Sequence, residues 1–374
     1  MGDQRPCHRP HRVDMDVGDR AMQAGWRGNE QVGRAHAAKI GRQPANVIAA
    51  GLAGVAGRRY GLAMSAHRSS GDAVADRRYA YAMQYRAADE PGAAAELIEQ
   101  ALELAPGWAA GWVALGEARE AAGAGEPAAS AYRHALELDP ADTAGARARL
   151  ARLGEAPADG AVTPAHVAAL FDDYAARFEA SLVGALAYRG PALLRQAVTA
   201  VTAAGGPARF DRAVDLGCGT GLAAEAFADL CARIDGVDLS ANMLAAAAGK
   251  GLYASLTQAS IDAYLEAEPA ASADLVLAAD VLVYLGDLGA LFVRVARVLR
   301  ASGRFAFTVQ TAEGGGDFVL GPDLRYAHGA DAVRRWAAAA GLAVRMLQEA
   351  STRTDAGRPV PGLLLVLEKP ETAG

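Results

Sequence analysis

The chain has 374 residues, with 37 Lys or Arg, 43 Asp or Glu and 52% hydrophobic residues. That apolar fraction is ample for packed cores, and at roughly 150 residues per domain the length suggests two globular units plus additional chain. The formal net charge of −6 argues against the clustered basic excess of a nucleic-acid-binding surface, so we expect no nucleic acid as an obligatory partner.

The three cysteines, Cys7, Cys218 and Cys231, form neither a secreted disulfide framework nor a zinc-binding C-x-x-C spacing. We therefore expect a reducing, cytoplasmic location and no bound metal. No window of the sequence approaches the roughly 18 unbroken apolar residues of a membrane-spanning helix, so no membrane partner is expected.

Residues 1–63 carry ten Lys or Arg against five acids and show no helical or alternating apolar periodicity. They could be a basic arm for an acidic partner or a transit peptide, although three acids within 14–19 argue against the latter. Met64 could also be the real start of translation. We predict that residues 1–73 are a disordered or misannotated leader.

Residues 74–153 contain an internal repeat. ALELAP at 101–106 returns as ALELDP at 135–140, an offset of 34 residues. This is the period of a helix-turn-helix repeat whose units bury their apolar faces by stacking. With Trp112 and Tyr132, the pattern resembles the tetratricopeptide consensus and predicts a tetratricopeptide-like helical domain. Such a domain either docks a partner or is a packing extension without a ligand of its own.

A linker rich in Gly, Pro and Ala is predicted at 154–163, followed by a second domain at 164–374. In this domain short apolar runs alternate with helical patterns, which is typical of a parallel sheet with crossover helices on both faces. The runs are 213–216, 234–237, 275–278 and 305–309, with a weak one near 252–256. Two further runs, 343–347 and 363–367, predict an antiparallel edge.

The strongest local signal is VDLGCGTGL at 214–222. A strand ends at Asp215 and Leu216, and glycines follow at alternate positions before a helix. Such glycines let the backbone turn tightly and approach a ligand, and the helix N-terminus adds unpaired N–H groups. A dinucleotide fingerprint would need Gly where Leu222 stands, and Asp215 would repel phosphate but suit an ammonium group. A nicotinamide-dependent oxidoreductase is therefore a weak alternative.

IDGVDLSANML at 234–244 ends the second predicted strand at Asp238, 19 residues beyond Gly219. A carboxylate at this strand tip can accept two charge-assisted hydrogen bonds from the vicinal hydroxyls of a ribose. The pattern predicts a ribose-containing ligand without requiring a phosphate.

DLGCGTG, DLSANML and ADLVLAADVLVYLGDL at 273–288 resemble the class I S-adenosylmethionine-dependent methyltransferases, and the likeness runs from about residue 164 to the C-terminus. The preceding repeats resemble those of bacterial methyltransferases that contain tetratricopeptides. Segments 171–194, 325–329 and 358–370 are similar to parts of that group. The resemblance implies an α/β, Rossmann-like, mostly parallel seven-stranded sheet with helices on both faces, preceded by an all-α tetratricopeptide-like domain, and S-adenosylmethionine as cofactor.

The resemblance also implies cofactor contacts. The methionine portion would lie against Asp215, Gly217, Cys218, Gly219 and Gly221, the ribose against Asp238, and the adenine between Leu239 and Met243. Many relatives have an acid at the end of the third strand, where this chain has Ser260 followed by Ile261. Asp280, at the end of the fourth strand, and Tyr174, on a helical lid, complete the expected set, although Tyr174 could equally serve packing.

The loop after the fourth strand should line the place where the methyl group leaves sulfur. A carboxylate or thiol acceptor needs no strong base. For a hydroxyl or amine acceptor, His328 is the preferred general base, ahead of Tyr284 and Asp280. Arg325 could anchor an acidic acceptor or pair with Asp323.

The sequence thus predicts methyl transfer from S-adenosylmethionine to an unidentified acceptor. This acceptor is a small molecule, a carrier-bound group or a protein docked on the repeats. The alternative is a non-catalytic interaction protein whose Rossmann-like domain is vestigial or senses the cofactor.

Overall fold

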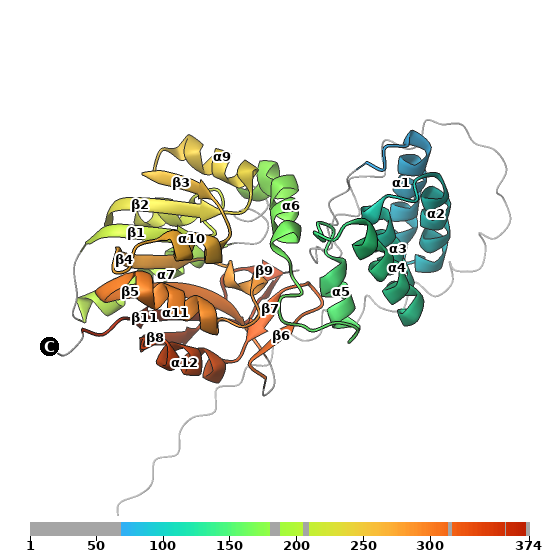
Figure 1. Ribbon diagram of the computed structural model, residues 1–374. Coiled ribbons are helices and arrows are strands. Elements are labelled where there is room, and N and C mark those ends of the chain that lie inside the picture. The colour runs from blue at the N-terminus through green and yellow to red at the C-terminus, as the bar shows by residue number, and fades with distance from the viewer. Residues whose placement is uncertain (1–68, 180–187, 205–208, 313–315, 356, 372–374) are drawn as a thin grey trace, which may run out of the picture. The chain divides into compact units, whose positions relative to one another are not determined.

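The computed structural model describes residues 69–179, 188–204, 209–312, 316–355 and 357–371 (Figure 1). The predicted leader falls almost entirely on residues 1–68, which lie outside the described residues.

The first described part of the chain is helical. Its helices are α1 (Ala73–Ala87), α2 (Pro91–Leu104), α3 (Ala109–Ala121), α4 (Gly125–Leu138) and α5 (Ala146–Arg152). Helix α1 begins where Asp72 Oδ1 accepts hydrogen bonds from the backbone N–H groups of Val74 and Ala75, at 2.7 and 2.9 Å. Helices α2 and α4 begin 34 residues apart, which is the period expected from the sequence.

Small residues let the helices of this part approach closely. A Cβ atom on Gly116 of α3 would lie 2.3 Å from Cε1 of Tyr132 on α4, so only glycine fits there. Tyr132 itself is fully buried, and its hydroxyl donates to Glu120 over 2.9 Å. The close contact explains why a large aromatic residue and a glycine share the interface between α3 and α4.

The second part is built on one sheet. Within the described residues it has nine strands, and its main path runs β3-β2-β1-β4-β5-β11-β8. The strands are β1 (Phe210–Leu216), β2 (Cys231–Asp238), β3 (Ser255–Gln258), β4 (Ala273–Ala278), β5 (Leu299–Thr311), β6 (Phe318–Leu320), β7 (Tyr326–His328), β8 (Ala343–Glu349) and β11 (Gly362–Glu368). Strands β3 through β5 of this path pair in parallel, which confirms the predicted mostly parallel, Rossmann-like sheet. A separate hairpin consists of β9 (Thr354–Asp355) and β10 (Arg358–Pro359).

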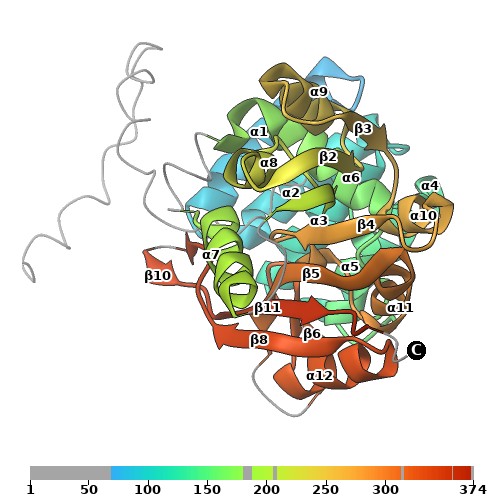
Figure 2. The same ribbon diagram turned by 90° about the vertical axis from the view of Figure 1, so that its left-hand side faces the viewer.

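Helices cover both faces of the sheet (Figures 1 and 2). They are α6 (Pro164–Tyr174), η1 (Ala175–Arg177), α7 (Gly190–Ala203), α8 (Leu222–Phe227), α9 (Ala241–Lys250), α10 (Ile261–Ala267), η3 (Leu282–Tyr284), α11 (Gly289–Val298) and α12 (Ala330–Ala339). Two apolar cores lie on opposite faces. One includes Leu291 and Phe292 of α11, and the other includes Leu194 and Val198 of α7.

Strands β8 and β11 pair antiparallel at one end of the sheet, which confirms the antiparallel edge expected from the sequence. Strand β8 is outermost, and β11 lies inside the sheet, antiparallel to both β5 and β8. Its residues alternate between the two cores: Leu363 and Leu365 face one, Leu364 and Val366 the other. A strand buried on both faces reads as one continuous apolar run, which explains the sequence GLLLVLE.

The predicted linker packs against β7. The backbone N–H groups of Ala161 and Val162 donate to the hydroxyl of Tyr326 over 3.1 and 3.3 Å, and this hydroxyl donates to the carbonyl of Ala158 over 2.5 Å. These bonds fix the start of β7, and Arg325 is the residue directly before this strand.

The position of the site follows from the strand order. Strand β1 lies between β2 and β4, so the connections that leave its end and the end of β4 run in opposite directions along the sheet. A crevice forms at such a switch point, beyond the carboxyl ends of the strands.

Candidate functional site

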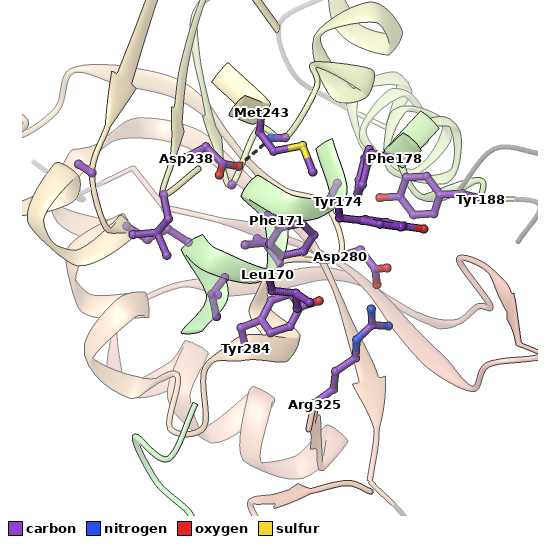
Figure 3. A pocket seen from close by; sticks show the side chains of 18 residues that line it. Leu170, Phe171, Tyr174, Phe178, Tyr188, Asp238, Met243, Asp280, Tyr284 and Arg325 are labelled. Carbon is purple, nitrogen blue, oxygen red and sulfur yellow. Dashed lines mark hydrogen bonds between the residues drawn. The ribbon is translucent and has the colours of Figure 1, made fainter. Parts of the chain in front are cut away.

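A pocket lies at this switch point (Figure 3). Eighteen described residues line it: Val167, Leu170, Phe171, Tyr174, Phe178, Tyr188, Gly217, Gly219, Asp238, Leu239, Met243, Ala259, Ile261, Ala279, Asp280, Val281, Tyr284 and Arg325. Residues far apart in the sequence therefore meet here, because β1, β2 and β4 all end at the same edge.

The glycine loop between β1 and α8 forms the floor of the pocket. Gly217 has a φ of 65° and Gly219 a φ of 54°, in the left-handed region that favours glycine. A Cβ atom on Gly217 would also lie 2.3 Å from Cγ2 of Val281. The loop needs glycine here both for its backbone conformation and for its contact with the segment after β4.

Asp238, at the end of β2, lines the pocket beside this loop. Its Oδ2 accepts a hydrogen bond from the N–H of Gly219 over 2.9 Å, and its Oδ1 accepts one from the N–H of Ser240 over 2.8 Å. Burial raises the pKa of Asp238, while these two hydrogen bonds lower it. The carboxylate is held in a fixed orientation and keeps lone pairs for a ligand.

Asp215 lies behind the loop and does not line the pocket. It is 1% exposed, its Oδ2 accepts a hydrogen bond from the hydroxyl of Tyr253 over 2.6 Å, and its Oδ1 has no hydrogen-bond partner in the described part of the chain. Burial, assisted by the negative charge of Asp238, raises the pKa of Asp215 to about 7, although the Tyr253 hydrogen bond lowers it. Nothing in the sequence pointed to Tyr253 as the partner of this acid.

Aromatic residues from α6, η1 and the loop after β4 form one wall. Phe171 contacts Tyr284 edge-to-face at 5.5 Å and Phe178 at 6.1 Å between ring centroids, and Tyr174 contacts Phe178 at 5.6 Å. Helix α6 is tied to the end of β2, since the hydroxyl of Ser240 donates to Oδ1 of Asp172 over 2.6 Å. Tyr174 therefore packs against Phe178 and also lines the pocket.

Asp280 follows β4 with an unusual backbone. Its φ of 59° is rare for a residue with a side chain, and its N–H donates to Oγ1 of Thr308 over 2.9 Å. Its carboxylate accepts a hydrogen bond from Arg353, which comes from the segment before β9. Backbone conformations of this kind are often found in functional sites.

His328 lies on β7 outside the pocket lining. It is fully buried, and its Nε2 is 3.0 Å from the carbonyl oxygens of both Leu285 and Gly286. Its ring packs edge-on to Trp336 at 6.2 Å, and burial lowers its pKa. The geometry gives the imidazole a role in holding the loop after β4 and provides no support for its predicted role as a base.

The predicted site residues thus divide into two groups. Those that line the pocket are Tyr174, Gly217, Gly219, Asp238, Leu239, Met243, Ile261, Asp280 and Tyr284. Those outside the lining are Asp215, Cys218, Gly221, Ser260 and His328. The hydroxyl of Ser260 accepts the N–H of Ala263 over 3.2 Å and so caps α10. Its neighbour Ala259, which the sequence analysis passed over, lines the pocket instead.

Tyr188 is a further lining residue that sequence reasoning missed. It lies between the described ends of η1 and α7, and burial raises the pKa of its hydroxyl.

The described residues contain no group of His, Cys, Asp and Glu that could hold a metal ion. They also contain no helix long and apolar enough to cross a membrane.

A family model described as "Methyltransferase domain" matches residues 214–307, from the glycine loop to β5. Over these residues the chain is similar to methyltransferase domains, and the matched segment includes the strand ends at which the pocket lies.

Curated relatives match this chain over a short span. The ubiquinone biosynthesis O-methyltransferase of Bradyrhizobium sp. (strain ORS 278) is 41% identical over 96 residues, which are 25% of this chain and 37% of that protein. The protein of the same name from Rhodopseudomonas palustris (strain BisB18) is 38% identical over the same shares. The chain therefore spans little more than a third of these relatives.

Among solved structures, the 1,6-didemethyltoxoflavin-N1-methyltransferase of Burkholderia thailandensis is 18% identical, with a TM-score of 0.40. The match covers 49% of this chain and 79% of that one. The magnesium protoporphyrin IX methyltransferase of Synechocystis PCC 6803 is 17% identical, with a TM-score of 0.37, and the match covers 48% and 79% of the two chains.

Proposed function

We propose that this protein transfers the methyl group of S-adenosylmethionine to an acceptor that binds in the same pocket, beside Asp280 and Tyr284. The main support for the proposal is that Asp238, the glycine loop and the aromatic residues of α6 and η1 all line one pocket. A donor bound across the glycine loop would have its methyl group near Asp280 and Tyr284, where the acceptor is proposed to bind.

The residues present fit the donor. The carboxylate of Asp238 can accept hydrogen bonds from ribose hydroxyls, and Leu239, Met243 and Ile261 are proposed to contact the adenine through their apolar side chains. Asp215 supports an ammonium group nearby, because its buried Oδ1 has no partner among the described residues. Since the Ser260 hydroxyl caps α10, apolar contact is proposed to dominate adenine binding.

When bound, S-adenosylmethionine supplies a methyl group already activated by a sulfonium. The contribution of this chain is then alignment and exclusion of water, which the aromatic wall over the pocket favours. Tyr284 and Asp280 are the proposed catalytic groups, because both line the pocket and His328 does not. The O-methyltransferase name of the curated relatives supports oxygen as the accepting atom.

The helices α1 to α4 are proposed to be tetratricopeptide-like and to dock a partner or the carrier of the acceptor. The 34-residue spacing of α2 and α4 supports this assignment. A cytoplasmic location is part of the same proposal.

Calorimetric titration with S-adenosylmethionine and S-adenosylhomocysteine tests the donor half of the proposal. We expect the wild-type protein to bind both in the micromolar range, and Asp238→Ala to lose roughly 100-fold in affinity because a charge-assisted pair of hydrogen bonds is removed. Asp211→Ala is the matched control, since its side chain is 91% exposed at the start of β1. Unchanged affinity in Asp238→Ala would remove this residue from the site, and absence of heat with the wild type would contradict the proposed function.

A further inference from the structure

Arg325 brings a positive charge to the acceptor side of the pocket. It precedes β7, lines the pocket and is 9% exposed. Its guanidinium points into the pocket, toward Asp280 (Figure 3). Since β7 is fixed by the hydrogen bonds of Tyr326, the backbone that carries this arginine is held in place.

The guanidinium forms no ion pair with a carboxylate of the described residues. Asp280, the acid it points toward, pairs with Arg353 over 2.6 Å. Asp323, the neighbour in sequence, uses Oδ1 to accept the backbone N–H of Arg325 over 3.3 Å. Burial lowers the pKa of Arg325, but Tyr284, Asp280 and Asp323 raise it, so the guanidinium stays charged. Because Asp280 and Asp323 are engaged with other partners, a bound anion would compensate further for the water that the guanidinium loses.

Apart from Asp280, the pocket around Arg325 is mainly apolar and aromatic. Its Cζ lies 5.7 Å from the centroid of the Tyr284 ring, and Leu170, Phe171 and Tyr188 line the same pocket. A ligand that fits both features has an apolar body and an anionic end.

The number of positively charged residues that line the pocket indicates which kind of anion it would bind. Among the described lining residues Arg325 is the sole cation, and its planar fork matches a carboxylate in bidentate fashion. A phosphate group carries about two negative charges near neutral pH and would call for further donors. A singly charged carboxylate therefore suits the site better.

We propose that the methyl acceptor is an acid with an apolar body, and that its carboxylate pairs with Arg325. This inference rests on the proposed function, because it assigns the acceptor half of that pocket. It makes Arg325 a specificity-determining residue rather than part of the donor site.

The test compares three probes of similar shape: 3-phenylpropionate, 3-phenylpropionamide and 2-phenylethylphosphonate. Each is titrated into the full chain with saturating S-adenosylhomocysteine, and again without it. We expect the acid to bind at least about tenfold more tightly than the amide, because only the carboxylate can form a charge-assisted, bidentate pair with the guanidinium. The preference should vanish in Arg325→Met and return in part in Arg325→Lys.

Arg335→Met is the matched control, since it removes a positive charge from the nearby helix α12 at a side chain that is 60% exposed. It should keep the preference for the acid. Retained binding of S-adenosylhomocysteine by Arg325→Met shows that the fold is intact. If the wild-type protein binds acid and amide equally, binds neither, or prefers the phosphonate, the inference is wrong.

The preference for the acid must also disappear in Arg325→Met, and its persistence there would overturn the inference. Failure of the proposed function is distinguishable from these results. It would appear as absence of S-adenosylhomocysteine binding, while the three probes still report on Arg325 in the titration without that ligand.

Discussion

Arg353 donates a hydrogen bond from Nη1 to Oδ2 of Asp280 over 2.6 Å, and so joins the segment before β9 to the end of β4. The two side chains are only 5% and 15% exposed. Oγ1 of Thr352 lies 3.4 Å from the other carboxylate oxygen. This contact fixes an acid of the pocket from a part of the chain more than 70 residues away.

Removing Arg353 should therefore destabilise the fold. Arg353→Leu removes the cation that pairs directly with the buried carboxylate of Asp280, and we expect the free energy of unfolding to fall by up to about 3 kcal/mol, since Arg325 still faces this acid. Chemical denaturation measures this change. The double variant Arg353→Leu/Asp280→Asn should recover part of the loss, and the exposed Arg335→Leu should change little. Equal stability of wild type and Arg353→Leu would show that the pair contributes nothing.

The glycine loop predicts a difference between two substitutions. Gly217→Ala places a Cβ atom 2.3 Å from Val281 at a φ of 65°, so we expect a loss of at least about 2 kcal/mol in unfolding free energy and weaker donor binding. Gly249→Ala, in helix α9, meets open space and should be neutral or stabilise by up to about 1 kcal/mol. Val281→Ala should relieve part of the Gly217→Ala defect. Normal stability of Gly217→Ala would contradict the packing described for the loop.

Asp215 predicts a pH dependence of stability. Its pKa is raised to about 7 in the folded protein, against about 3.9 in an unfolded chain, so the folded state binds more protons between these values. Its contribution to stability is complete below about pH 4 and is lost as the pH rises through about 7. Unfolding free energies of wild type and Asp215→Asn, measured from pH 5 to 8, isolate this effect from other titrating groups. The wild type should lose stability relative to Asp215→Asn as the pH rises, and parallel curves would refute the assignment.

Substitution of His328 is expected to lower stability without weakening donor binding. His328→Gln disturbs the contact with the carbonyl groups of Leu285 and Gly286, and we expect a loss of about 1–3 kcal/mol in unfolding free energy. Affinity for S-adenosylhomocysteine should stay within about twofold of the wild type, because the ring does not line the pocket. A large loss of affinity with unchanged stability would place the imidazole in the site after all.

Much of the fold could be predicted because local patterns determine it. The glycine loop and the position of Asp238 follow from strand ends and backbone freedom, which neighbouring residues reveal. The order of β8 and β11 could not be predicted, since it depends on which strand β5 accepts as a partner. The continuous apolar run of β11 was a signal for a buried strand.

The acceptor side of the site was harder to predict. The sequence offers two partners for Arg325, an acidic acceptor or Asp323, and only tertiary packing shows that its guanidinium points toward Asp280 (Figure 3). Tyr188 and Arg353 come from two other segments, which no local pattern connects to this acid. His328 was predicted to lie in the site but lies outside it. The direction of its side chain depends on the alternation along β7, and a strand of three residues is too short for that alternation to be recognised in the sequence. Asp215 was found correctly as a carboxylate next to the loop, but its burial behind the loop was not visible in the sequence.

One pocket is expected to bind the donor through Asp238 while Arg325 faces the acceptor. The decisive measurement is a crystal structure of the protein with S-adenosylhomocysteine and 3-phenylpropionate. We predict ribose hydroxyls within hydrogen-bonding distance of the Asp238 carboxylate and the probe carboxylate paired with the Arg325 guanidinium. Density for either ligand outside this pocket, or an empty pocket at saturating concentrations, would contradict the account.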